Sequence, residues 1–253
     1  MTAPLPPVEY IRRTRDLRHL VQQLGGVPLL AIDTESNSLY AYYERVCLVQ
    51  LSTREADYIV DPLAMDDISP LGDLLRDPAT EIVFHAAEYD VITLKRDYGF
   101  TFANIFDTMM AARICGWPQT GLGNILVDQF GIVADKKFQR ADWSRRPLDP
   151  DQLRYAQMDT HYLPALRDRL LNELAGLGRL EEARELFAAL PDLPPAGHVF
   201  DPDGFWRIHA VRALRPGQIA VARELYLARD DIAQRHDWPP FKVFSDQVLA
   251  RLA

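Results

Sequence analysis

The stretch Leu29–Glu35, which reads LLAIDTE, decides the fold. Its apolar half, Leu29–Ile32, is typical of a buried strand, which is expected to end at the polar residues that follow. Because side chains alternate along a strand, Asp33 and Glu35 point to the same face. Two carboxylates on one face repel each other unless a cation lies between them or water solvates both. Carboxylate oxygens suit Mg²⁺ or Mn²⁺, so residues 33–35 are either a cation site or a solvated strand end.

Short apolar runs and helical spacing predict the other elements of this part of the chain. Four more strands are expected, at Val46–Leu51, Asp57–Val60, Glu81–Phe84 and Asn104–Phe106. Five helical segments are expected, at Ile68–Leu75, Glu88–Tyr98, Thr108–Cys115, Leu122–Phe130 and Asp151–Leu174. We expect Gly99 to end the second helix, Thr108 to cap the third, and Pro164 to kink or divide the last. Early strands followed by helices predict an α/β or α+β core, of which we expect the α/β class.

The C-terminal quarter of the chain has a different character. Residues 191–204 contain four prolines and two glycines and are the best candidate for a linker. Three helical patterns follow it, at Trp206–Leu214, Pro216–His236 and Ser245–Leu252. We therefore expect an α/β domain at 1–190, a linker at 191–204 and a small helical domain at 205–253.

Composition excludes several classes of protein. With 253 residues, 48% of them hydrophobic and 25% charged, the chain is long enough and apolar enough to bury a core. The two cysteines, Cys47 and Cys115, form no zinc or disulfide pattern, which favours a reducing compartment, the cytoplasm. No signal peptide or membrane span is expected. The net charge of −8 argues against a general nucleic-acid binder, so contact with a nucleic acid would have to be local.

Further acids lie at positions that can join the first pair. Asp90 falls in the first turns of the helix after the strand Glu81–Phe84, where an acid also complements the helix dipole. Tyr155 and Asp159 are four residues apart on the long helix and share one face. Taken singly, each of these residues fits an ordinary amphipathic helix. Taken in order, four acids and a tyrosine form a specific pattern.

This pattern resembles the DEDD superfamily of 3′–5′ exonucleases, whose three motifs correspond to DTE at 33–35, HAAEYD at 85–90 and YAQMD at 155–159. Tyr155 matches the tyrosine subtype, because Arg154 stands where the histidine subtype has its histidine. The resemblance extends to the ribonuclease D family through RVCLVQLS at 45–52, FDT at 106–108, GLGNIL at 121–126 and DKKFQRADWSRRPL at 135–148. The C-terminal segment resembles part of the helicase-and-RNase-D C-terminal (HRDC) domain.

The resemblance implies an RNase H-like mixed sheet flanked by helices and two bound divalent cations, Mg²⁺ or Mn²⁺. Asp33 would bind both ions, Glu35 and Asp159 would complete one site, and Asp90 would hold the other. Tyr155 would orient the attacking water. The expected reaction releases 5′-monophosphates one at a time from an RNA 3′ end, such as that of a tRNA precursor. DNA is the alternative substrate, and a catalytically inactive RNA-binding scaffold is the alternative of another class. The oligomeric state stays open, with a monomer favoured.

Residues 136–146 form the one strong basic cluster, with five basic residues, one acid (Asp142) and Trp143 among them. Such a segment can follow phosphates while its aromatic ring stacks on a base. The candidate substrate contacts are His85, Lys136, Gln139, Trp143 and Arg145. The alternatives are that this segment is a solvated loop whose tryptophan packs in the core, and that His85 is structural.

Overall fold

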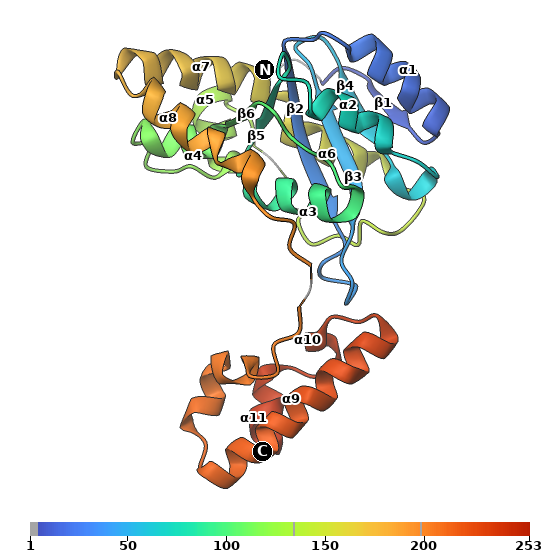
Figure 1. Ribbon diagram of the computed structural model, residues 1–253, viewed down its shortest axis with the longest axis vertical. Coiled ribbons are helices and arrows are strands. Elements are labelled where there is room, and N and C mark those ends of the chain that lie inside the picture. Colours follow the sequence, from blue (N-terminus) through green and yellow to red (C-terminus); the bar gives the residue numbers. More distant parts are fainter. Residues whose placement is uncertain (1–4, 134, 198) are drawn as a thin grey trace. The chain divides into compact units, whose positions relative to one another are not determined.

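The computed structural model describes residues 5–253 except Ala134 and His198. A six-stranded mixed sheet lies at the centre of the larger part of the chain, in the order β1-β4-β3-β2-β5-β6 (Figure 1). Strand β3 runs antiparallel to β2 and β4, whereas the other neighbouring strands are parallel. The strands are β1 Val8–Ile11, β2 Leu29–Ser36, β3 Val46–Ser52, β4 Asp57–Val60, β5 Glu81–Phe84 and β6 Ile105–Asp107. This sheet confirms the predicted RNase H-like α/β fold.

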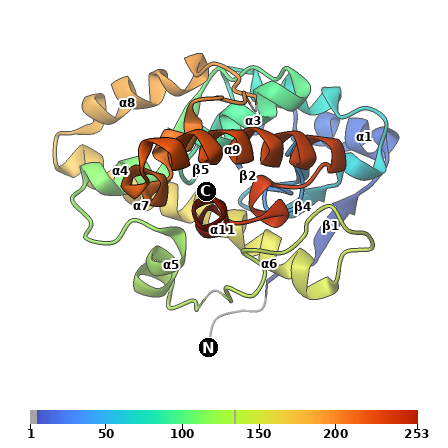
Figure 2. The ribbon, with the colours of Figure 1, turned by 90° about the horizontal axis from the view of Figure 1, so that it is seen from below.

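Helices cover both faces of the sheet. Helices α6 and α7 pack on one face, and α1, α2 and α3 lie on the other (Figures 1 and 2). The helices are α1 Thr14–Leu24, α2 Gly72–Leu75, α3 Glu88–Tyr98, α4 Thr108–Ile114, α5 Leu122–Phe130, α6 Pro150–His161, α7 Leu163–Gly176 and α8 Leu180–Ala188. The first strand, β1, and the helices α1 and α8 were not expected from the sequence. Strand β1 has four residues and depends on pairing with β4, a partner that a local pattern cannot reveal.

The strand that carries the first motif is longer than its apolar run predicts. Strand β2 continues to Ser36 because Asp33 pairs with Gln50 and Glu35 with Leu48 of β3. An irregularity in the pairing between Glu35 and Ser36 then ends the regular ladder. Asp33 and Glu35 are therefore held on a hydrogen-bonded strand rather than on a free strand end, which fixes the direction of both carboxylates.

Turn and cap residues behave as expected with one exception. Gly99 ends α3 in the left-handed conformation at φ 67°, and the predicted helix 151–174 is divided after His161 with Pro164 in the first turn of α7. The cap of α4 is Asp107, not Thr108. The Asp107 carboxylate accepts hydrogen bonds from the amides of Met109 and Met110, and Thr108 is the first helical residue.

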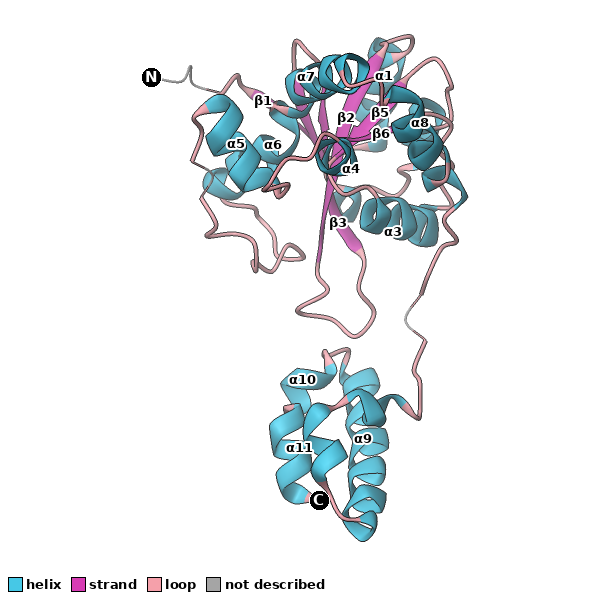
Figure 3. Cartoon of the chain, turned by 90° about the vertical axis from the view of Figure 1, so that its left-hand side faces the viewer, coloured by secondary structure: helices cyan, strands magenta, loops and turns pink. Residues whose placement is uncertain are grey.

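The chain divides into two compact units, and each is described by itself. The first contains residues up to 36 and 46–196, and the second contains Asn37–Arg45 and Gly197–Ala253. The second unit is helical and contains α9 Pro216–His236, α10 Pro240–Val243 and α11 Asp246–Leu252 (Figure 3). The predicted helix at 206–214 is instead two short 3₁₀ turns, Gly204–Arg207 and His209–Ala213, because Ile208 between them is extended.

This division differs from the predicted domains in two respects. The first unit reaches Ala196, and the loop between β2 and β3 belongs to the C-terminal unit. Within the described residues, no helix is both long enough and apolar enough to cross a membrane.

Candidate active site

Three carboxylates from two distant parts of the chain meet at the end of β2. Asp33 and Glu35 lie on β2, and Asp159 lies on α6, which packs against β2, β3 and β4. One oxygen of each carboxylate lies within 4.8 Å of the others. These three residues were singled out from the sequence, and the fold brings them together.

Asp90 borders this cluster. It lies in the first turn of α3, directly after β5, and β5 is the parallel neighbour of β2. Parallel strands end at the same edge of a sheet, so Asp90 reaches the edge where Asp33 and Glu35 lie. Its carboxylate is only 6% exposed and accepts a hydrogen bond of 2.5 Å from the Thr34 hydroxyl. Thr34 was not predicted as a site residue, although its place inside the DTE motif is a signal.

The cluster is electrostatically short of positive charge. Burial, together with the charges of Asp90, Asp159 and Glu35, raises the pKa of Asp33 well above its usual range. Burial, and then the charges of Asp159 and Asp90, raise the pKa of Glu35. Burial, and then the charge of Asp90, raise the pKa of Asp159 to about 7. Burial also raises the pKa of Asp90 to about 7. Buried oxygen ligands that repel one another fit a hard divalent cation, which would supply the missing charge.

Tyr155 stands one helical turn before Asp159 on α6. Its ring packs against Phe138 at 5.9 Å and Trp143 at 6.0 Å between ring centroids. Burial and then the charges of Asp159, Glu35 and Asp33 raise the pKa of the phenol. A protonated phenol at this position can donate a hydrogen bond toward the acidic cluster.

The prediction that Trp143 stacks on the substrate is wrong. Its side chain is 2% exposed and packs in a cluster with Cys47, Leu48, Ile59, Leu148 and Ala156. Burying the indole removes a large apolar surface from water, which outweighs exposure on a loop. The indole ring therefore packs against Tyr155 inside the fold and does not point to solvent.

Arg146, counted in the basic cluster, is also structural. Its guanidinium pairs with the fully buried Asp61 through two bonds of 2.7 Å, and it donates to the carbonyls of Cys47 and Trp143. Such a pair orders the segment before α6 but leaves no charge for a phosphate. The basic cluster is therefore smaller than its sequence suggests.

Lys136 and Gln139 lie where a substrate could be contacted. Both side chains are exposed, and both line a cavity of about 270 Å³ together with Tyr155, Asp159 and Asn124. A second cavity of about 300 Å³ adjoins the same two α6 residues and is lined by Phe138, Arg154 and Met158 among others. Asp159 and Tyr155 thus face space on two sides.

Arg145 and His85 are placed less favourably for substrate contact. The Arg145 side chain is 82% exposed, but its guanidinium is bonded to the Asp142 carboxylate at 3.1 Å. A ring nitrogen of His85, Nδ1, lies 2.9 Å from the Thr108 hydroxyl, and burial lowers the pKa of His85 to about 4. A neutral, partly buried imidazole offers no charge to a phosphate, and its Nδ1 bond to Thr108 fits the structural alternative.

One aromatic side chain beside the site was not singled out from the sequence. Tyr89, the neighbour of Asp90, is 44% exposed, and its hydroxyl lies 2.9 Å from that of Ser36 at the end of β2. The signal that could have found it is its position inside the HAAEYD motif.

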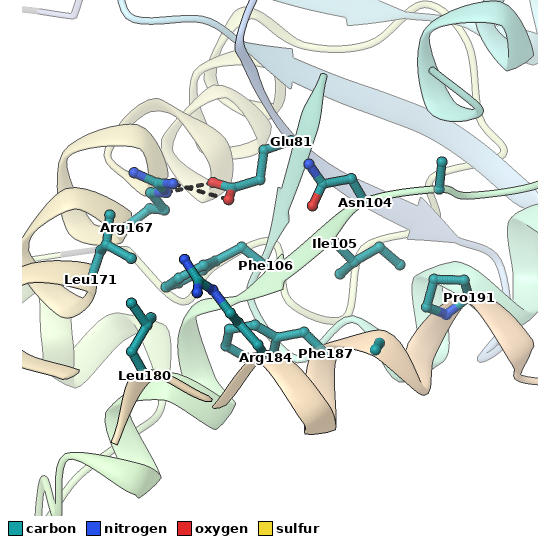
Figure 4. A pocket seen from close by; sticks show the side chains of 12 residues that line it. Glu81, Asn104, Ile105, Phe106, Arg167, Leu171, Leu180, Arg184, Phe187 and Pro191 are labelled. Atoms are coloured by element: carbon teal, nitrogen blue, oxygen red, sulfur yellow. Dashed lines mark hydrogen bonds and ion pairs between the residues drawn. The ribbon is translucent and has the colours of Figure 1, made fainter. Parts of the chain in front are cut away.

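A different cavity, of about 460 Å³, lies beside β6, α7 and α8 (Figure 4). Two charged residues that line it already form an ion pair, in which the Arg167 guanidinium donates to the Glu81 carboxylate. The apolar side chains of Phe106, Phe187 and Leu171 line the rest. None of the five candidate catalytic residues lines this cavity, so it is not the candidate active site.

Comparisons with known proteins agree with this geometry. A 3′–5′ exonuclease family model matches residues 8–175, and an HRDC domain model matches residues 218–253. Ribonuclease D of Gluconacetobacter diazotrophicus is 34% identical over 99% of this chain and 64% of its own length. The exosome complex exonuclease RRP6 of Saccharomyces cerevisiae is 33% identical over 96% of this chain. The catalytic core of RRP6 from Trypanosoma brucei superposes with a TM-score of 0.90, at 31% identity, over 96% of this chain and 69% of that one.

The match to these relatives is partial on their side, since the chain spans only 35% of the length of the yeast protein. Exonucleases of this family need divalent cations, and the three converging carboxylates are the residues suited to hold them. The family model covers more than half of the chain and includes all five residues of the acidic site. The chain therefore belongs to the 3′–5′ exonuclease family that includes ribonuclease D, and it carries an HRDC domain at its C-terminal end.

Proposed function

We propose that the protein is a metal-dependent 3′–5′ exoribonuclease that removes nucleotides one at a time from RNA 3′ ends. The observation that carries this proposal is the convergence of Asp33, Glu35 and Asp159, with their oxygens within 4.8 Å, beside Asp90 and Tyr155. The name of the bacterial relative, ribonuclease D, supports RNA as the substrate. Trimming of stable RNA such as tRNA precursors is the role we favour.

The residues of the site have distinct parts in the proposed reaction. Asp33, Glu35 and Asp159 would hold one divalent cation, and Asp33 and Asp90 would hold the other; Mg²⁺ or Mn²⁺ suits both. When bound, the cations activate water and stabilise the leaving oxygen. Tyr155, protonated and held by Phe138 and Trp143, donates a hydrogen bond that orients the attacking water or the scissile phosphate. Inversion of the local charge by the cations allows an acidic cluster to accept a phosphate.

Substrate contacts are proposed at the rim of the site. Lys136 and Gln139 share a cavity with Tyr155 and Asp159, and the partly exposed Tyr89 precedes Asp90 on α3. A lysine there would neutralise a backbone phosphate, and Tyr89 would contact a base or sugar. Arg145 is a weaker candidate because Asp142 already binds it. We propose a cytoplasmic location, since Cys47 and Cys115 form no disulfide.

The decisive experiment follows RNA and DNA of the same sequence, labelled at the 5′ end and separately at the 3′ end. We expect a ladder that shortens from the 3′ end of RNA and release of 5′-monophosphates in Mg²⁺ or Mn²⁺. EDTA should stop the reaction, and Zn²⁺ should support it poorly because no His or Cys belongs to the cluster. The Asp33→Asn variant is the control for a contaminating nuclease.

Each alternative has its own outcome in that experiment. Faster degradation of DNA than of RNA would identify a DNA exonuclease. Binding of RNA without degradation under every metal condition would identify an inactive scaffold. The presence of all four acids and Tyr155 disfavours the scaffold, because such a protein has no need to keep a charged, mutually repelling cluster.

A further inference from the structure

Gln50 carries a buried side-chain amide that no described residue hydrogen-bonds. It lies on β3 with 0% of its surface exposed, and neither its side-chain oxygen nor its nitrogen has a hydrogen-bond partner among the described residues. A buried amide that loses its bonds to water and forms none in the protein is unfavourable. An apolar side chain would fill the same place without that cost, so the amide requires an explanation.

The register of the sheet places Gln50 beside the acidic cluster. Gln50 lies directly opposite Asp33 of β2, and side chains of opposite residues in an antiparallel pair share one face. The next residues on that face of β3 agree with this placement, because Leu48 is opposite Glu35 and the hydroxyl of Ser52 contacts Thr160 of α6. Gln50 therefore lies beneath α6 and next to Asp33 on the same face of the sheet.

Another buried glutamine shows how an amide is satisfied on this face. Gln157 of α6 is 4% exposed, and its nitrogen donates to the Asp57 carboxylate at 2.6 Å and to the Pro6 carbonyl at 2.9 Å. Gln50 has no such arrangement, although its cross-strand neighbour is also a carboxylate. Carboxylates only accept hydrogen bonds, and an amide nitrogen only donates them, so Gln50 and Asp33 are chemically complementary.

We propose that Gln50 is a positioning residue of the cation site, whose amide nitrogen donates to the Asp33 carboxylate once cations draw that carboxylate into place. The inference rests on the proposed function only in assigning divalent cations to Asp33. Groups that hydrogen-bond metal-ligating carboxylates orient them, and their loss typically weakens metal binding about 10–100-fold. The unpaired amide of Gln50 would lower the stability of the metal-free protein, whereas its hydrogen bond would order the metal-bound site.

The test measures Mn²⁺ affinity without RNA, by the electron paramagnetic resonance signal of free Mn²⁺, together with the melting temperature in EDTA. For Gln50→Leu we expect affinity to fall about 10–100-fold while the melting temperature in EDTA stays the same or rises. The matched control, Gln157→Leu, removes a satisfied buried amide and should lower the melting temperature with little change in affinity. Gln50→Met serves in the same way if the leucine variant does not fold.

A measurement on the parent protein keeps the proposal testable without any variant. The side-chain amide resonance of Gln50 should shift when Mg²⁺ saturates the site. An unmoved resonance, or Mn²⁺ affinity within about threefold of the parent in a folded Gln50 variant, would overturn the proposal. Neither readout uses RNA. A protein whose cation affinity depends on Gln50 but which degrades no RNA would therefore refute the proposed function alone.

Discussion

The hydroxyl of Tyr42 donates to the Asp230 carboxylate, at 3.0 and 2.9 Å from its two oxygens, although 188 residues separate them. Tyr42 belongs to the loop that leaves β2 directly after the DTE motif, and Asp230 belongs to α9. Asp237 also accepts hydrogen bonds from the amides of Tyr42 and Tyr43. The loop therefore folds as part of the C-terminal unit, which is not built from residues 197–253 alone.

Removing that hydroxyl should loosen the loop. In Tyr42→Phe, the mostly buried Asp230 carboxylate loses its partner, which we expect to cost about 1–3 kcal/mol of stability. Thermal unfolding followed by circular dichroism measures the loss. Tyr43→Phe is the control, because it also removes a hydroxyl, but one whose hydrogen bond from Gln234 is exposed and should contribute less. Equal melting temperatures for Tyr42→Phe and the parent would contradict this role.

The same contact changes what truncation should do. From the sequence, a chain ending near residue 195 would keep its activity on short RNA, because the tail carries none of the acids. In the structure, such a truncation removes Asp230 and Asp237, which are hydrogen-bond partners of the loop that continues β2. We therefore expect slower degradation of short RNA as well as of structured RNA. Rates on both substrates, in a truncated protein shown to be folded, measure this.

Part of the candidate site could be predicted from the sequence, because spacing places Asp33 with Glu35, and Tyr155 with Asp159, on common faces of a strand and a helix. The resemblance to the DEDD exonucleases then joined these pairs with Asp90, and the structure brings Asp33, Glu35 and Asp159 together. Local patterns also located five of the six strands. The burial of Trp143 was an open alternative that the sequence could not decide. The Asp61–Arg146 pair and the Tyr42–Asp230 bond could not be predicted, because each joins residues far apart in the chain. The pairing of a charge or the burial of a ring depends on tertiary neighbours, which composition alone does not name.

Asp33→Asn should abolish turnover and stabilise the metal-free protein. Loss of this ligand removes several kcal/mol of transition-state stabilisation supplied by cations. The same change removes one of several buried, repelling charges, so the melting temperature in EDTA should rise. The control is Glu185→Gln, an exposed acid of α8. Activity within tenfold of the parent would refute the assignment of Asp33.

The pH dependence of stability follows from the raised pKa values. The pKa of Asp90 and of Asp159 is about 7 in the folded protein, and about 4 in an unfolded chain. A raised carboxyl pKa means that the folded protein holds the proton more tightly, so this contribution to stability is complete below pH 4. It is lost as pH rises through 7.

The melting temperature in EDTA should therefore fall between pH 5 and pH 8, and Mg²⁺ should raise it more at pH 8 than at pH 6. Titration of the melting temperature with and without Mg²⁺ provides the measurement. In Asp159→Asn the decline should be shallower. A decline of equal slope in the parent and in this variant would assign the effect to other groups.

Tyr155→Phe should slow the chemical step more than it weakens binding. The substitution removes one hydroxyl and keeps the ring that packs against Phe138 and Trp143, so the fold should persist. A positioned proton donor or water-holding group is typically worth about 10²–10⁴-fold. Single-turnover rates at saturating RNA isolate that step. The control is Tyr162→Phe, since Tyr162 follows α6, packs on Phe130 and lines neither cavity beside Tyr155. If only RNA affinity changes in Tyr155→Phe, Tyr155 is a substrate contact and the attacking water is oriented by another group.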